Sequence, residues 1–89
     1  MRVDKFLQLS RLVKRRVAAQ EMISVGAVLL NSRKVKSSSI VRVGDRLEIA
    51  FPRRVITVEI CTIDEVDLKR GASSVSVIEE RRVDDRETT

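Results

Sequence analysis

The spacing of apolar residues changes along the chain from a helical period to a strand period. Val3, Phe6 and Leu7 stand at positions i, i+3 and i+4, which predicts a short helix that begins near Arg2 or Val3. A second helix is predicted over residues 12–23, "LVKRRVAAQEMI". Later apolar and polar residues alternate, as in strands with one buried face. Two helices are therefore expected before a sheet.

The predicted second helix has distinct faces. Its apolar side gathers five residues: Ala18, Ala19, Met22, Ile23 and Val25. Arg16 and Gln20, four positions apart, share the polar side. Gly26 supplies a C-terminal stop. The two short helices are expected to pack closely through the small alanines.

Three strand regions follow. "AVLLNSRKVK", residues 27–36, predicts a hairpin that turns near Asn31 and Ser32, with Val35 facing inward. Gly44 and Asp45 mark the next turn. Two alternating strands follow it, separated by Pro52, with the inward residues Leu47, Ile49 and Phe51 and then Ile56, Val58 and Ile60. "SVSVIEE" is a candidate last strand, whereas "RRVDDRETT" has too few apolar residues to order itself.

These elements predict a small α+β domain, with two short N-terminal helices packed on a small antiparallel sheet. With 89 residues, 43% of them hydrophobic, the chain suffices for one compact core and is too short for two. We expect residues 1–52 to form the main part of the domain, residues 53–80 to form strands that complete the same domain, and residues 81–89 to form a disordered tail.

Several classes of protein fit the sequence poorly. No apolar stretch is long enough for a signal peptide or a spanning helix, so a cytoplasmic location is expected. The chain has no His and a single cysteine, Cys61, which is expected to be a small core residue. It also has no glycine-rich phosphate loop, so no enzyme activity, metal or cofactor is predicted.

Positive charge is concentrated in the N-terminal part. Residues 1–54 contain thirteen of the eighteen Lys and Arg but only four acidic residues, a net charge of +9. Residues 55–89 carry a net charge of −4. Such asymmetry favours a polyanionic partner for the N-terminal part.

The densest positive cluster, Lys14, Arg15 and Arg16, opens the predicted second helix. A helix N-terminus already carries partial positive charge, so cations there are unfavourable unless an anion binds. We expect a phosphate, rather than a carboxylate of the chain, to neutralise the arginine pair. The alternative is that one or two of these cations precede the helix and face water.

The scarcity of aromatic residues indicates the type of polyanion. The two aromatic residues, Phe6 and Phe51, both stand at apolar-face positions, so no platform for stacking unpaired bases is expected. Neither predicted helix is long or apolar enough for a membrane surface. Contact with the backbone and shape of structured RNA fits best.

The ordered motifs resemble the S-four-type RNA-binding domain, also called the alpha-L motif. They are the R-x-D-K-F-L start, the R-R-x-x-A-x-x-x-I-x-x-G second helix, the V-x-L-N turn and the V-G-D turn, within residues 2–49. The chain resembles the free-standing members, the ribosome-associated quality control factor P family and the heat-shock protein fifteen family. That resemblance implies binding to large-subunit rRNA on stalled ribosomal subunits, with tRNA as a further candidate, in support of the quality control of stalled nascent chains. A monomer without membrane contact is expected.

The resemblance also implies a set of RNA-binding residues. They are Arg2, Asp4, Lys5, Lys14, Arg15, Arg16, Gln20, Arg33, Lys34 and Lys36. The sequence departs from the family pattern at Arg15, where many members have a capping Ser, and at Ser32, where Gly usually follows Asn31. Asp4 has two interpretations: a partner for its own helix dipole, or a carboxylate that orients Arg2 or a neighbouring Arg toward RNA.

Two other functions remain open from sequence. A DNA-binding helix-turn-helix protein could use the same basic helix pair, although such a regulator normally adds a dimerisation surface. A protein-binding adaptor could act through the acidic C-terminal half. The adaptor predicts binding that barely changes with salt, whereas nucleic-acid binding weakens steeply with salt.

Overall fold

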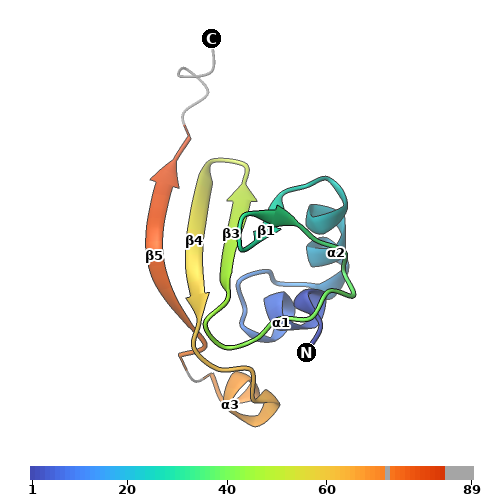
Figure 1. Cartoon of the computed structure of the whole chain (residues 1–89), viewed down its shortest axis with the longest axis vertical. Helices are drawn as coiled ribbons and strands as arrows, with labels where there is room; N and C mark the ends of the chain where they lie inside the picture. Colours follow the sequence, from blue (N-terminus) through green and yellow to red (C-terminus); the bar gives the residue numbers. More distant parts are fainter. Residues whose placement is uncertain (72, 84–89) are drawn as a thin grey trace.

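A computed structural model describes residues 1–71 and 73–83 of the chain. The helices are α1 (Val3–Leu9), α2 (Arg16–Ser24) and α3 (Glu65–Lys69), and the strands are β1 (Val28–Leu30), β2 (Arg33–Lys34), β3 (Arg46–Phe51), β4 (Arg54–Ile60) and β5 (Val75–Arg82). The strands form one sheet in the order β2-β1-β3-β4-β5, and all neighbours are antiparallel. The α1 and α2 helices lie together beside the β1 end of the sheet (Figure 1). The predicted α+β class is confirmed.

The α1 helix begins as predicted, but α2 begins later than the sequence suggested. Arg16 is the first helical residue, Arg15 is the N-cap without a side-chain capping bond, and Lys14 precedes the helix. The alternative in which some of the cations precede the helix is therefore correct for Lys14 and Arg15. Gly26 follows the helix with φ of +78°, a conformation that glycine adopts without a Cβ clash, so the predicted stop is confirmed. Val25 is 79% exposed, so its assignment to the apolar side was wrong.

The first hairpin turns at the predicted residues. Leu30 pairs with Arg33, and the two residues between them, Asn31 and Ser32, have φ of 50° and 69°, as a type I′ turn requires. The Asn31 side chain joins this turn to the next one, because its Nδ2 donates to Asp45 Oδ1 (3.2 Å) and its Oδ1 accepts from the Arg46 N–H (3.0 Å). The V-x-L-N and V-G-D motifs thus meet in space.

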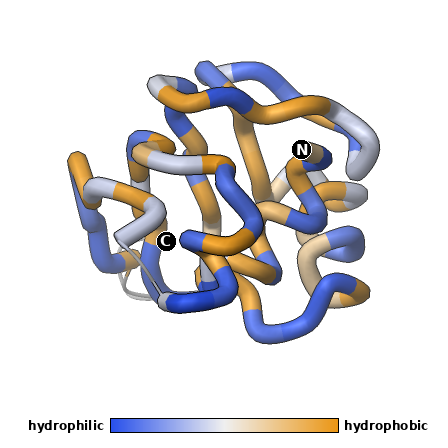
Figure 2. The backbone as a smooth tube through the Cα atoms, turned by 90° about the horizontal axis from the view of Figure 1, so that it is seen from below, coloured by the Kyte–Doolittle hydropathy of each residue, from blue (hydrophilic) through white to orange (hydrophobic). Residues whose placement is uncertain are grey.

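One hydrophobic core joins the helices to the sheet. Its members include Val3, Phe6 and Leu7 of α1, Ala19 and Ile23 of α2, and the inward residues of β1, β3 and β4. Hydrophobic stretches alternate with polar ones on both helices and strands, as Figure 2 shows, because each element buries one face only. Leu68 of α3 also belongs to this core.

The C-terminal part contains features that the sequence analysis missed. The α3 helix was not predicted, although Asp64 caps it by accepting hydrogen bonds from the N–H groups of Val66 (2.8 Å) and Asp67 (3.3 Å). Cys61 is exposed, so the core assignment was wrong: Ile56, Val58 and Ile60 face inward, and the next residue faces outward.

The predicted last strand is confirmed and is longer than expected. β5 continues through Arg81 and Arg82, which had been assigned to a disordered tail, because it pairs with β4 over its whole length, with one bulge opposite Thr57 and Val58. The remainder of that tail, residues 84–89, lies outside the described residues.

Within residues 1–71 and 73–83, none of the helices has the length and hydrophobicity that crossing a membrane requires.

Candidate nucleic-acid interface

A buried carboxylate lies where the two N-terminal helices meet. Asp4 of α1 has no exposed surface, yet its carboxylate accepts six hydrogen bonds from four residues. Its Oδ1 accepts from Arg2 Nε (3.2 Å), Arg16 Nη2 (3.4 Å) and the Lys5 backbone N–H (2.8 Å). Its Oδ2 accepts from Arg2 Nη2 (3.1 Å), Arg16 Nε (3.2 Å) and Gln20 Nε2 (2.9 Å). We call Arg2, Asp4, Arg16 and Gln20 the Asp4 cluster.

The local structure explains why these four side chains meet. Arg16 and Gln20 are one helical turn apart, so both project from the same side of α2 toward α1. The segment before β3 holds the start of α1 in place, because the Val3 and Asp4 N–H groups donate to the carbonyls of Ser39 (2.8 Å) and Ser37 (3.4 Å). A β-bridge between Arg2 and Ile40 continues this contact.

The charge state of Asp4 follows from these contacts. Burial favours the neutral acid, but the hydrogen bonds from Gln20, Arg16 and the Lys5 N–H, together with the charge of Arg16, outweigh it. The pKa of the Asp4 carboxyl is therefore below its usual value, and Asp4 is ionised at neutral pH. One negative charge consequently faces two guanidinium groups.

The arginines of the cluster are held in place without being buried. The side chains of Arg2 and Arg16 are 46% and 42% exposed. The expectation that no carboxylate of the chain would meet the arginine pair is wrong for Arg16, because Asp4 binds it. Asp4 lies in the first turn of α1, as the helix-dipole interpretation requires, and it contacts Arg2 and Arg16; that it orients them toward RNA stays a prediction.

Lys14 and Arg15 lie beside this cluster at the start of α2. Both side chains are exposed, and neither forms an ion pair within the described part of the chain. No side chain caps the α2 N-terminus, so its first N–H groups have no side-chain acceptor from the N-cap residue. Free donors and three successive cations are thus placed together.

Lys5 has a different environment. It follows Asp4 on α1, and its ammonium group forms an ion pair with Glu65 at the start of α3. The charge and hydrogen bond of Lys5 lower the pKa of the Glu65 carboxyl. The sequence analysis did not identify Glu65, because nothing in the local pattern places α3 next to α1.

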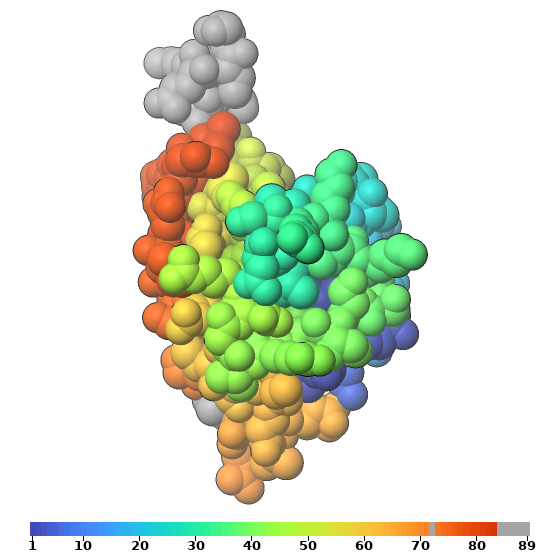
Figure 3. Space-filling model, viewed as in Figure 1, coloured from blue at the N-terminus to red at the C-terminus, as the bar shows by residue number. Residues whose placement is uncertain are grey.

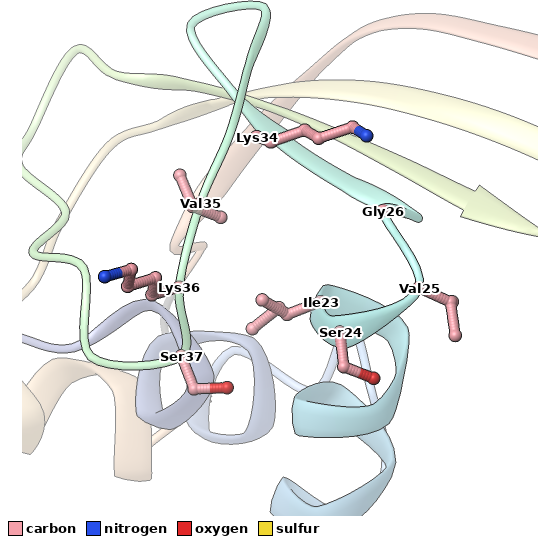
Figure 4. A pocket seen from close by; sticks show the side chains of 8 residues that line it. All are labelled: Ile23, Ser24, Val25, Gly26, Lys34, Val35, Lys36 and Ser37. Atoms are coloured by element: carbon pink, nitrogen blue, oxygen red, sulfur yellow. The ribbon is translucent and has the colours of Figure 1, made fainter.

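The remaining predicted cations form a second group. Arg33 and Lys34 make up β2 and Lys36 follows it, and all three are exposed. Lys34 and Lys36 line a cavity of about 430 Å³ at the C-terminal end of α2, together with Ile23, Ser24, Val25, Gly26, Val35 and Ser37. Lys34 extends toward Gly26, whereas Lys36 points to the other side of the chain (Figure 4).

The ten predicted residues therefore do not form one contiguous cluster. Arg2, Asp4, Arg16 and Gln20 are in direct contact, Lys14 and Arg15 flank them, and Lys5 is paired elsewhere. Within residues 1–71 and 73–83, no group of His, Cys, Asp and Glu could hold a metal ion. The geometry is that of a basic surface with one internal carboxylate.

The comparisons with known proteins agree with the motifs. The S4 domain family model matches residues 1–47. A protein of Halalkalibacterium halodurans named RQC P-site tRNA stabilizing factor is 41% identical over 75 residues, which are 84% of this chain and 85% of the relative. The Bacillus subtilis protein of the same name is 37% identical over 78 residues, 88% of this chain and 91% of the relative.

A solved structure supports the same fold. Trimeric Heat Shock Protein 15 of Vibrio cholerae superposes with a TM-score of 0.76 over 86% of this chain and 80% of that chain, at 23% identity. The resemblance to free-standing S-four-type proteins, inferred from the motifs, is thus confirmed by both sequence and fold. From the family match and the near full-length relatives, this chain belongs to the S4 domain family.

Proposed function

We propose that this protein binds structured RNA on the ribosome and supports the quality control of stalled nascent chains. The observation that carries the proposal is the Asp4 cluster, in which one buried carboxylate orients two half-exposed arginines, Arg2 at the N-cap of α1 and Arg16 at the start of α2. The near full-length relatives named RQC P-site tRNA stabilizing factor supply the biological setting. The targets in this proposal are large-subunit rRNA and P-site tRNA on obstructed, cytoplasmic ribosomal particles.

The proposed chemistry is recognition of the phosphate backbone. Each guanidinium has five N–H donors in a planar fork, so the bonds to Asp4 leave further donors for a phosphate. Asp4 limits the rotation of the two side chains, so less conformational entropy is lost when RNA binds. Lys14, Arg15 and the free N–H groups of α2 add donors on the same side.

The scarcity of usable aromatic residues supports structured rather than unpaired RNA. Phe6 is fully buried, and Phe51 is half-buried with the Arg54 guanidinium 5.0 Å from its ring centroid. The sequence has no Tyr and no Trp, so no open ring remains on which bases could stack. The second group, Arg33, Lys34 and Lys36, is a separate basic surface for a neighbouring RNA segment.

We propose that one copy of the chain acts alone, although the Vibrio cholerae neighbour is trimeric. The edge strand β5 carries a bulge and four successive charged residues, Glu79 to Arg82. Bulges and charges discourage edge-to-edge pairing of strands. Sedimentation equilibrium should give the mass of one chain, and a concentration-dependent trimer would contradict this part.

The central experiment compares Arg16→Ala with Arg81→Ala. Both variants remove one exposed cation, but Arg81 lies on β5, away from the Asp4 cluster. Arg16→Ala should weaken binding to large-subunit rRNA by about 5- to 30-fold and reduce the slope of log affinity against log salt by about one. Arg81→Ala should leave both quantities nearly unchanged.

The other candidate functions predict different outcomes. An adaptor acting through the acidic half would bind its partner with little dependence on salt and would tolerate Arg16→Ala. A DNA-binding protein would prefer duplex DNA over rRNA in direct competition. Equal effects of Arg16→Ala and Arg81→Ala would contradict a specific role for the Asp4 cluster.

A further inference from the structure

The Lys5–Glu65 ion pair connects the basic surface to a helix outside the S4 domain match. Lys5 lies within residues 1–47, which the family model covers, whereas Glu65 opens α3. The two helices are in contact, and α3 lies next to the N-terminal segment at the lower end of the molecule (Figures 1 and 3). A residue of the C-terminal part thus engages a cation of the RNA-binding motif.

Stability does not explain this contact. The side chains of Lys5 and Glu65 are 39% and 44% exposed, and ion pairs at such exposure contribute little to folding. The α3 helix is already held by Leu68 in the core and by the Asp64 cap. The pair therefore matters chiefly for which charges the surface offers to a ligand.

The position of Lys5 makes the contact relevant to RNA. Lys5 follows Asp4 on α1, and its backbone N–H donates to Asp4 Oδ1 (2.8 Å), so Lys5 lies at the border of the Asp4 cluster. An unpaired ammonium group there would extend the Asp4 cluster by one more phosphate contact. Instead Glu65 holds it, and Asp64 and Asp67 add negative charge at the same end of α3. The basic surface consequently meets an acidic border at the N-terminal end of α3, whereas Lys69 and Arg70 lie at the other end of this helix.

We propose that Glu65 is a specificity-determining residue: it keeps Lys5 from phosphate and repels RNA backbone that would spread from the Asp4 cluster over α1 toward α3. This inference rests on the proposed RNA-binding function. The RNA must then satisfy Arg2 and Arg16 from the side away from α3, which only RNA of suitable shape can do. Without Glu65, any RNA gains one further cation.

The test compares Glu65→Gln with Glu80→Gln in the full chain. Glu80 pairs with Arg54 on the sheet, with 49% and 52% of these side chains exposed, so both variants remove one acid from one surface ion pair. Affinity for a large-subunit rRNA transcript and for random-sequence duplex RNA is measured at 50 and 200 mM salt. Thermal melts verify that each variant is folded.

Glu65→Gln should steepen the dependence of affinity on salt for the random duplex, by the amount expected for one additional phosphate contact. The ratio of its affinities at the two salt concentrations should then increase by about threefold, because one contact contributes a slope of about −0.9. The preference for rRNA over the random duplex should decrease. The double variant Glu65→Gln/Lys5→Met should lose this gain, because the released ammonium is gone, and Glu80→Gln should show no gain.

The outcomes separate this inference from the proposed function. If the wild-type chain binds rRNA but Glu65→Gln and Glu80→Gln behave alike, net charge alone matters and Glu65 has no specific role. If the double variant keeps the gain, Lys5 is not the released group and the inference is wrong. If the wild-type chain does not bind rRNA, the proposed function and this inference both fail.

Discussion

Replacement of Asp4 by Asn tests the centre of the interface most directly. The change keeps the shape of the side chain but removes its charge and places an amide NH₂ where one oxygen accepted hydrogen bonds. This NH₂ group is a donor, and so are the side chains of Arg2, Arg16 and Gln20 that face it, so no hydrogen bond can form between them. Breaking a fully buried ion pair costs about 3–5 kcal/mol, but the half-exposed arginines can recover water. We therefore expect a loss of about 2–3 kcal/mol.

The loss is measurable by thermal or urea unfolding followed by circular dichroism. For a domain of this size, the expected decrease in Tm is about 10–20 °C. Glu79→Gln is the matched control, because it removes one exposed carboxylate on β5 and should change stability by less than about 0.5 kcal/mol. A variant Asp4→Asn as stable as this control would refute the structural role of the cluster.

The same variant separates orientation from charge in RNA binding. Asp4→Asn raises the formal net charge from +5 to +6, so a surface that recognises RNA through net charge alone would bind more tightly. The proposed orientation of Arg2 and Arg16 predicts weaker binding by about tenfold, because both side chains lose their anchor. Filter binding to large-subunit rRNA at temperatures where the variant is folded distinguishes the two results.

Three further predictions concern stability. Ser32→Gly should stabilise the chain by about 0.5–1 kcal/mol in urea unfolding, because Ser32 adopts φ of 69° in the hairpin turn and glycine does so without strain. Asp64→Ala should destabilise it by about 1 kcal/mol in the same assay, because α3 loses its cap. Because the folded pKa of Asp4 is lowered, its stabilisation is present above the usual carboxyl pKa of 3.8 and is lost as pH decreases through the lower folded pKa. Unfolding measured from pH 6 to pH 2 should show this loss in the wild-type chain and a smaller loss in Asp4→Asn.

Local periodicity in the sequence was sufficient to predict most of the helices and strands. The i, i+3, i+4 pattern placed α1 correctly, and the alternation in residues 46–60 gave β3 and β4 with their inward faces. The same alternation also implied an outward Cys61, which the emphasis on its apolar neighbours obscured. The α3 helix has only five residues, too few for a hydrophobic pattern, although its capping Asp64 and following acids were visible in the sequence.

The start of α2 and the contacts of the interface depended on tertiary structure. Val13 is buried and its N–H donates to the Leu7 carbonyl (3.0 Å), so the segment before Arg16 is fixed by α1 and does not continue the helix. The sequence placed Arg16 and Gln20 on one face of α2, but it could not show that Asp4 faces them across the helix pair. The partner of Lys5 likewise depends on the packing of α3.

The position of Asp4 also resolves the unfavourable cation at the start of α2. Arg16 is the first residue of a helix whose N-terminus has no side-chain cap, and its charge there opposes the helix dipole. Asp4 bonds to Arg16 and Gln20 in the first two turns of α2 while lying in the first turn of its own helix. One carboxylate therefore complements the positive end of its own helix and two guanidinium groups, one of which belongs to the first residue of α2. The chain can then keep its arginines half-exposed, where a phosphate can reach them, without the repulsion that an isolated basic helix start would have.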